Sequence, residues 1–292
     1  MGTVSLLSDR NPLEFLSSFD SLWALDDDVR VYATQLTSAD PLVLCAVSAS
    51  CHWLADKGKA IELVVPSACR HLEDMQFFES LPQGINVVNR DTAYPGQAPD
   101  SKVLLPIRHL STADDVNHAV EDFRVNAASY GGWVGGAVNS RLWISLSELL
   151  NNAQEHSFSP VGFFAGAWVD DESGPIRLAV VDLGLGVPKH LRRRTKYAHL
   201  TDDEAALREA MKEGVSGIDS KERGMGFVHV KKDAQVVSSG RLLIRAGKAQ
   251  LETRFSRRHE SRHSIAVNEF PGTWAYLAAS RPRRIDGRRS RR

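Results

Sequence analysis

Short stretches rich in β-branched residues alternate with helical patterns in the first 90 residues, and this alternation restricts the fold more than any other feature. The pattern predicts five elements in the order strand 29–36, helix 40–58, strand 60–66, helix 67–81 and strand 85–89. Ser67 is the expected N-cap of the second helix. Strands that alternate with helices are typical of an α/β layer. We therefore expect a small α/β domain over residues 1–92.

A stretch rich in Pro, Gly and Asp, "DTAYPGQAPDS" (91–101), is the best linker candidate in the chain. The pattern that follows predicts a strand at 102–110, a helix over 112–129 capped by Thr112 or Asp114, a break at "GGWVGG", a long helix, strands at 161–169 and 176–184, a hairpin over 240–253 turning near Ala246-Gly247, and a last strand at 273–279. We expect one larger α+β domain over residues 103–280.

The composition, 42% hydrophobic and 25% charged, is that of an ordinary soluble globular chain. No apolar run is long enough to span a membrane, and the N-terminus lacks the pattern of a secretory signal. Cys45, Cys51 and Cys69 form no C-x-x-C pair, and their odd number argues against a disulfide framework. We expect a cytoplasmic protein with buried free thiols.

The net charge of zero conceals a basic C-terminus. The final stretch, "SRPRRIDGRRSRR", holds seven arginines and one aspartate, so it carries +6 and the rest of the chain −6. We expect residues 281–292 to form a disordered basic tail. Such a tail could contact nucleic acid or an acidic partner. The alternative is a solvated terminus without a specific role.

Polar residues occupy one strip of the long helix, in the stretch "ELLNNAQEHS". Glu148, Asn152 and His156 are four residues apart and share a side of the helix, next to a face made by Leu146, Leu149, Leu150 and Ala153. An asparagine oxygen suits Mg²⁺, and a glutamate can accept a proton from water or a hydroxyl. The alternative is an ordinary exposed polar face.

Two glycine-containing segments follow. In "LAVVDLGLGVP" an apolar strand ends in Asp182, with Gly184 and Gly186 behind it, and a buried carboxylate there needs a partner. Asp182 could accept a hydrogen bond from an exocyclic amine, although a D-x-G strand-to-loop turn is the alternative. Gly224 and Gly226 precede a helical pattern, and a helix N-terminus favours phosphate. The alternative there is a simple loop before a helix.

Together, these clusters resemble the motifs of the Bergerat-fold, or histidine-kinase-like, ATPases. The N box E-x-x-x-N-A corresponds to Glu148, Asn152 and Ala153. The first glycine box D-x-G-x-G corresponds to Asp182, Gly184 and Gly186, and the second box G-x-G corresponds to Gly224 and Gly226. A late Gly-Thr corresponds to Gly272 and Thr273. Met225 and Phe227 stand where many members have leucine. The resemblance covers residues 103–280 and implies a two-layer sandwich of a mixed sheet and helices.

The resemblance also implies roles. Asn152 would hold Mg²⁺ against the phosphates of ATP, and Glu148 would be the general base. Asp182, helped by Thr273 through a water, would bind the adenine amino group. Gly184 and Gly186 would shape the adenine pocket; Gly224, Met225 and Gly226 would border the triphosphate; and His156 would lie near the nucleotide or only cap its helix.

A lid that closes over the nucleotide would span residues 189–217. Arg192, Arg193 and Arg194 in it could reach phosphates, and a solvated basic turn is the alternative.

Residues 25–90 resemble the STAS domains of anti-sigma-factor antagonists by their order of strands and helices. Regulated members carry Ser or Thr after the aspartate that precedes the first helix, whereas this chain has Pro41 after Asp40. Proline has no hydroxyl, so we expect a docking module rather than a phosphoacceptor.

Two functions remain open at this point. The first is a Mg²⁺-dependent ATPase or protein kinase that acts in trans on a protein partner, similar to the anti-sigma-factor serine kinases. The second is a non-catalytic switch, in which ATP holds the lid closed and controls which partner docks. Either would bind its partner through the STAS-like domain or the lid, with a homodimer as a further option. Binding of nucleic acid would involve only the tail.

Overall fold

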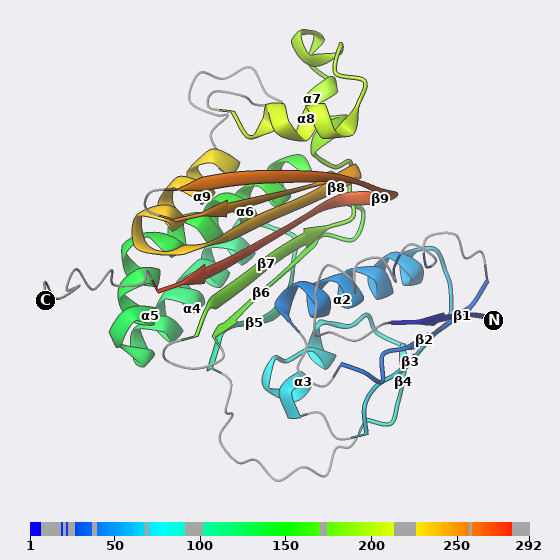
Figure 1. The fold of residues 1–292 in the computed structure, drawn as a ribbon. Helices are drawn as coiled ribbons and strands as arrows, with labels where there is room; N and C mark the ends of the chain where they lie inside the picture. Colours follow the sequence, from blue (N-terminus) through cyan, green and yellow to red (C-terminus); the bar gives the residue numbers. More distant parts are fainter. Residues whose placement is uncertain are drawn as a thin grey trace, which may run out of the picture.

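The computed structural model describes residues 1–6, 19, 22, 27–36, 40–67, 70–90, 102–169, 174–212, 226–256 and 259–281. The linker candidate, Cys69 and the tail beyond Arg281 lie outside these residues. The chain is an α/β protein with a four-stranded N-terminal sheet and a five-stranded C-terminal sheet (Figure 1). No helix in the described ranges is long and apolar enough to cross a membrane.

The N-terminal sheet is parallel throughout, with its strands in the order β1-β2-β3-β4. They are β1 Gly2–Ser5, β2 Val29–Tyr32, β3 Ile61–Val64 and β4 Asn86–Val88. The three predicted strands are confirmed, each shorter than its β-branched stretch. The pattern does not indicate β1, because four residues with alternating small and polar side chains carry little signal.

The first predicted helix is α2, Pro41–Asp56, and it begins where the sequence supplies a cap. The Asp40 carboxylate accepts a hydrogen bond from the Leu42 amide at 3.0 Å, and Pro41 occupies the start of the helix. Every side chain from Pro41 to Cys51 is buried. A helix that is buried on all sides must be covered on all sides. Cys45 and Cys51 are among these residues, and both are free thiols as expected.

The second predicted helix, 67–81, is wrong as a single element. The structure has a short helix α3, Arg70–Asp74, and a 3-10 turn η2, Phe78–Ser80. Gln76 between them has a φ of 51°, which ends the helix and redirects the chain. The Phe77 amide then donates to the Leu72 carbonyl at 2.9 Å, and both side chains are fully buried. The helical spacing therefore predicted correctly which side chains are buried, but it did not predict the break in the helix at Gln76.

The C-terminal sheet has the order β5-β6-β7-β9-β8, and every neighbouring pair is antiparallel. Its strands are β5 Lys102–Leu110, β6 Phe163–Val169, β7 Ile176–Asp182, β8 Ser239–Phe255 and β9 Glu260–Ser280. The expected mixed sheet is wrong. The helices between β5 and β6 run out and back, so β6 starts beside the end of β5, with Phe163 paired to Leu110. A connection that returns to the same end of the sheet makes an antiparallel pair.

A layer of helices covers one face of this sheet (Figure 1). Its elements are α4 Ala113–Tyr130, α5 Gly132–Ala137, the π-helical turn η3 Val138–Leu142, α6 Trp143–His156 and α9 Gly226–Val237. Thr112 caps α4, as expected, in a capping box with Asp115. Gly131, with a φ of 57°, ends α4. The predicted break at "GGWVGG" is otherwise wrong, because residues 132–137 form α5 at once.

The opposite face of the C-terminal sheet packs on α2. Phe163 and Ala165 of β6 belong to the core shared with the helix layer, whereas Phe164 and Trp168 belong to the core shared with α2 and the N-terminal sheet. Successive side chains of a strand point to opposite faces, so the central strands are covered on both. The C-terminal sandwich therefore carries the N-terminal unit as a further layer, with α2 between the two sheets (Figure 1).

The strand expected over 240–253 does not turn at Ala246-Gly247. β8 continues to Phe255, and the pairing register with β9 shifts around Gly247, which has a φ of 60°. The turn lies instead between Phe255 and Glu260, which pair across the end of the ribbon. Beyond the shift the ribbon covers α9, since the Gln235 amide donates to the Ser256 carbonyl at 2.6 Å. Glycine in a strand can mark a bulge as well as a turn.

The predicted lid, residues 189–217, overlaps α7 Val187–Arg192 and contains a 3-10 turn η4 Thr195–Tyr197 and α8 Asp203–Ala210, while residues 213–217 lie outside the described residues. We call α7 to α8 the lid segment. Leu191, Tyr197 and Ala206 form a small core of their own. Figure 1 shows this unit beyond the β8–β9 edge of the sheet.

Candidate functional site

The helix α6 presents the two faces that its sequence predicts. Leu146, Leu149, Leu150 and Ala153 are at most 5% exposed and pack in the helix-side core. Glu148, Asn152 and His156 lie outside that face and are half-buried. They are therefore neither core residues nor a fully solvated strip, and their environment distinguishes the two alternatives.

Glu148 lies among other ionisable groups at the contact of α6 with α9. Burial raises the pKa of Glu148, His229 of α9 lowers it, and Asp233 and Glu155 raise it. A carboxylate whose pKa is moved towards neutrality is better suited to accept a proton than a solvated one. The environment is thus compatible with the predicted base.

The Asn152 side chain has no visible structural task. Its Nδ2 atom is buried and has no hydrogen-bond partner. The adjacent Asn151 is exposed, and its Nδ2 donates to Ser147 Oγ at 3.3 Å. A buried donor without an acceptor costs about 1–3 kcal/mol, so it calls for an explanation. An oxygen-rich ligand beside Asn152 would supply the missing acceptor.

Asp182 ends β7 and is 4% exposed. Its Oδ1 accepts a hydrogen bond from the Gly184 amide at 2.9 Å, and the Thr273 amide donates to the same carboxylate. Burial raises the pKa of Asp182 to about 7, against the effect of these two amides. A carboxylate offers about four acceptor positions, so two backbone donors leave capacity for a ligand amine.

Backbone contacts hold the end of α6, the loop after β7 and the core part of β9 together. The Leu185 amide donates to the Ser157 carbonyl at 2.6 Å. A Cβ on Gly184 would lie 1.9 Å from the Ser157 carbonyl oxygen, and one on Gly272 would lie 1.9 Å from that of Asp182. These glycines are required because backbone passes directly over backbone. The three segments that carry Asn152, Asp182 and Thr273 therefore converge.

The same junction orients α7. Gly186 precedes the helix with a φ of 75°, and a Cβ there would lie 2.7 Å from the Gly272 carbonyl oxygen. Thr273 Oγ1 accepts a hydrogen bond from the Val187 amide at 3.2 Å. Thr273 thus contacts both Asp182 and the first residue of α7. The predicted adenine-shaping role of Gly184 and Gly186 stays a prediction; the contacts here are with backbone.

A stack of rings that sequence reasoning missed lies beside Asn152. His190 of α7 stacks on His156, and the two ring centroids are 4.9 Å apart. His190 also stacks on Phe158, with ring centroids 6.2 Å apart. Phe158 has a φ of 52°, and the Arg193 guanidinium lies 5.0 Å from its ring. No local pattern singles out His190, because its partner lies on another element and is distant in sequence.

The ring nitrogens of this stack lack partners. His156 Nδ1 and both His190 nitrogens are buried without a hydrogen bond. Burial, together with His156 and Arg193, lowers the pKa of His190 to about 4. His190 is therefore neutral at physiological pH. With Asn152 Nδ2, four unpartnered nitrogens occur on three neighbouring side chains, which is not the environment of a helix-capping histidine.

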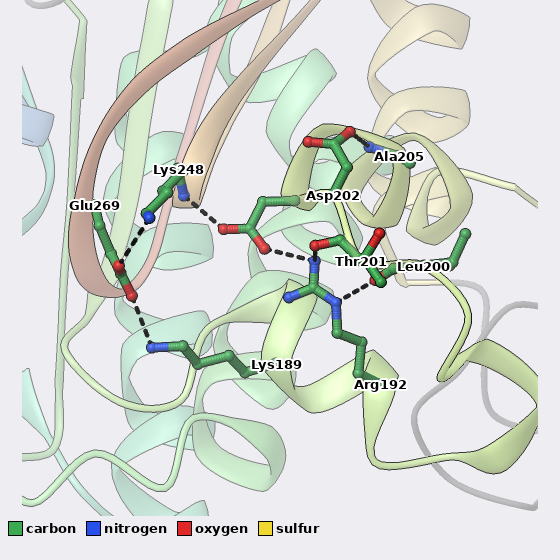
Figure 2. Close-up of polar contacts among 9 residues, drawn as sticks. Lys189, Arg192, Leu200, Thr201, Asp202, Ala205, Lys248 and Glu269 are labelled. Atoms are coloured by element: carbon green, nitrogen blue, oxygen red, sulfur yellow. Dashed lines mark hydrogen bonds and ion pairs between the residues drawn. The ribbon is translucent and has the colours of Figure 1, made fainter.

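Figure 2 shows how Arg192 holds the lid segment together. Its guanidinium forms an ion pair with Asp203 at 2.6 Å and donates to the carbonyls of Leu200 and, at 3.1 Å, Thr201. Arg194 lies over the Tyr197 ring at 5.6 Å. In this conformation Arg192 is bonded within the lid.

A second set of charged contacts joins the lid segment to the β8–β9 ribbon (Figure 2). Glu269 of β9 pairs with Lys189 of α7 at 3.0 Å and with Lys248 of β8 at 3.7 Å. The Lys248 amide donates to Asp203 at 2.8 Å. Gly247 permits this approach, because a Cβ there would lie 2.3 Å from Asp203 Oδ2. Exposed ion pairs contribute about 0–1 kcal/mol each, so these charged contacts add little to the attachment that the buried side chains of α8 make in the helix-side core.

Asp40, where the STAS resemblance places its regulatory turn, is buried within the chain itself. Its carboxylate accepts hydrogen bonds from the Leu42 amide and, at 2.8 Å, from the Tyr276 hydroxyl of β9, with Arg177 of β7 at 3.8 Å. Burial raises the pKa of Asp40. The turn therefore docks on the C-terminal sheet of the same molecule.

The remaining predicted positions are only partly described. Gly224 and Met225 lie outside the described residues, and Gly226 is the first residue of α9, as the helical pattern predicts. The described residues contain no group of three or more His, Cys, Asp or Glu side chains that could hold a metal ion.

No protein-family model matches this chain, and no curated protein matches it.

Proposed function

We propose that this protein binds ATP with Mg²⁺ in the region between α6, the loop after β7 and α7, and acts as an ATP-dependent kinase or ATPase on a protein partner. One observation carries the proposal. The residues that resemble the N box, the first glycine box and the late Gly-Thr belong to three segments joined by the contacts of Gly184 and Gly272. The meeting of these three segments at one place supports the resemblance of their motifs.

The side chains fit the proposed ligand. The unpartnered Asn152 amide would gain an acceptor, and its oxygen is a hard ligand for Mg²⁺. Asp182, when ionised, has acceptor positions left for an adenine amino group. Bound Mg²⁺ would neutralise charge on the phosphates.

Glu148 would provide the base in this scheme. Burial raises the pKa of Glu148. The residue lies at the contact of α6 with α9, close to His229 and Asp233. The carboxylate would accept the proton of the attacking hydroxyl or water, and His229 would stabilise its ionised form in the resting protein. Phosphoryl transfer otherwise needs positioning and charge neutralisation, which the remaining residues supply.

Calorimetric titration with MgATP tests the binding proposal. We expect Asn152→Ala to weaken binding at least tenfold, a loss of about 1.4 kcal/mol. The matched control is Asn151→Ala, which removes the neighbouring exposed asparagine of the same helix. Wild-type protein that binds no MgATP, or two variants with equal affinities, would refute the proposal.

A non-catalytic ATP-gated switch is the second candidate, and the exposed ion pairs of Glu269 with Lys189 and Lys248 favour it. Ion pairs of Glu269 and Asp203 that open and close could couple ligand binding to a partner surface without turnover. Glu148→Gln separates the candidates, with Glu121→Gln, an exposed glutamate of α4, as control. A kinase or ATPase loses phosphate release or partner phosphorylation only in Glu148→Gln and still binds ATP. A switch shows no turnover in any of the three proteins.

A further inference from the structure

His190 is the least satisfied side chain of the site. Its ring lies between those of His156 and Phe158, and neither of its nitrogens has a hydrogen-bond partner although both are buried. A neutral imidazole has one hydrogen-bond donor and one acceptor, and in His190 neither of them forms a hydrogen bond. Stacking alone would be served equally well by phenylalanine, which has no polar atoms to desolvate.

The unpartnered nitrogens around His190 indicate which class of ligand could bind there. Asn152 Nδ2 can only donate, and His156 and His190 can each donate from one ring nitrogen. Two cations lie near the rings, Lys189 and Arg193 of α7 and its C-cap. One carboxylate also lies there, that of Glu155, 3.8 Å from His156 Nε2. Donors and cations together fit an anion with several acceptor oxygens, and phosphate is such an anion.

We propose that His190 is a phosphate-binding residue of the lid, which leaves His156 and donates a hydrogen bond to a phosphate oxygen of the bound nucleotide. This inference rests on the proposed function and deepens it. It assigns His190 to recognition of the phosphates rather than of the adenine base, whose proposed partner is Asp182 at the end of β7.

The exchange of partners requires α7 to move. In the present arrangement the stack covers the nitrogens, so an oxygen can reach them only when the two rings separate. The outer attachment of α7 is the Lys189–Glu269 pair, whose side chains are 55% and 48% exposed. Gly186 precedes α7 at a φ of 75° and places a glycine where the helix joins the fixed junction. The ligand thus replaces a stacking contact and an exposed ion pair, both of which break readily.

The test compares nucleotides that differ only in their phosphates. Adenosine, AMP, ADP and ATP, with Mg²⁺, are titrated calorimetrically into wild type, His190→Ala and the control His199→Ala, an exposed histidine of the same lid segment. A charge-assisted hydrogen bond supports an expected weakening of about tenfold for ATP in His190→Ala, with adenosine unchanged. His199→Ala should match wild type throughout.

The other outcomes overturn the inference. Equal weakening of adenosine and ATP in His190→Ala assigns the residue to the base or to the fold, and no weakening removes it from the site. Wild type that binds none of the ligands refutes the proposed function as well, which separates the two failures.

A measurement on the wild type guards against a misfolded variant. The imidazole ring signals of His190, identified by their absence from His190→Gln spectra, should shift on addition of MgADP but not of adenosine. Ring signals that respond to neither ligand, or to both alike, contradict the phosphate assignment.

Discussion

The junction under the site and the lid segment beside it are held by different forces. At the junction, Ser157, Gly184 and Gly272 bring backbone onto backbone at distances that exclude any side chain. The lid segment has a small core of its own and reaches the β8–β9 ribbon through exposed charges such as Lys189 and Glu269. It is also attached through Leu207 of α8 and Met211 at its C-cap, which are buried in the helix-side core. Packed backbone resists deformation, whereas exposed ion pairs are weak and screened by salt.

The difference separates positioning from movement. The junction places Asp182 and the start of α7 with little freedom, and Thr273 contacts both. Within the lid segment α7 can change its position more readily than α8, because α7 reaches β9 through the exposed Lys189–Glu269 pair whereas Leu207 and Met211 hold α8 in the helix-side core. A site with a fixed floor, here the junction, and a movable wall, here α7 of the lid segment, suits a ligand that must be enclosed and released. Each prediction below perturbs one side of this comparison.

The largest effect is expected at the junction. Gly272→Ala places a methyl group 1.9 Å from the Asp182 carbonyl oxygen at a φ of 81°. Overpacking together with a left-handed β-carbon should lower the free energy of unfolding by about 4 kcal/mol. Urea denaturation followed by circular dichroism measures it.

Gly136→Ala is the matched control for Gly272→Ala. Gly136 lies within α5 with nothing within 4 Å of an added Cβ, so alanine there should stabilise the helix slightly. A Gly272→Ala protein as stable as wild type would show that the junction is not rigid.

Sequence patterns predicted the elements that surround this comparison better than the contacts within it. The apolar strand that ends in Asp182 and the helix strip of Glu148, Asn152 and His156 lie where their periodicity placed them. Periodicity reports which side chains are buried, and burial decided those elements. It does not report what covers them, so the second burial of β6 and β7 under α2 was not foreseen.

The errors arose where one residue serves a distant contact. Gly247 indicated a hairpin turn, but it accommodates Asp203 of α8 in a continuing strand. Gln76 adopts a left-handed conformation that its residue type does not announce. His190 acquires its position through His156, on another element. In each case the cause is tertiary, and a local window cannot contain it.

A pH-dependent effect of intermediate size is expected from Asp182. Its pKa is raised to about 7 in the folded protein, compared with about 3.9 for an unperturbed aspartate. The folded state therefore binds the proton more tightly, so this contribution to stability is complete below about pH 4 and is lost as the pH rises through 7. The expected loss is on the order of 3 kcal/mol between pH 4 and pH 8.

Asp182→Asn tests this contribution by removing the titration while keeping the shape of the side chain. Urea midpoints at several pH values should fall less steeply for the variant than for wild type between pH 5 and pH 8. The control Asp114→Asn changes an exposed aspartate in the first turn of α4. Identical pH profiles for wild type and Asp182→Asn would mean that the junction admits water to the carboxylate.

The smallest effect on global stability, and the largest on local motion, is expected at the lid. Glu269→Gln removes the ion pairs with Lys189 and Lys248, and exposed pairs of this kind contribute less than about 1 kcal/mol. Hydrogen exchange should accelerate in α7 and stay unchanged in β7 and in α8, because α8 keeps its buried Leu207 and Met211 in the helix-side core. Glu121→Gln, which breaks an exposed pair with Arg124 on α4, should leave α7 unaffected.

The acceleration should also shrink as salt is added, since ions already weaken the wild-type pair. Exchange that accelerates equally in α7 and β7 would mean that the lid and the junction open as one unit, and the division between fixed floor and movable wall would then be wrong.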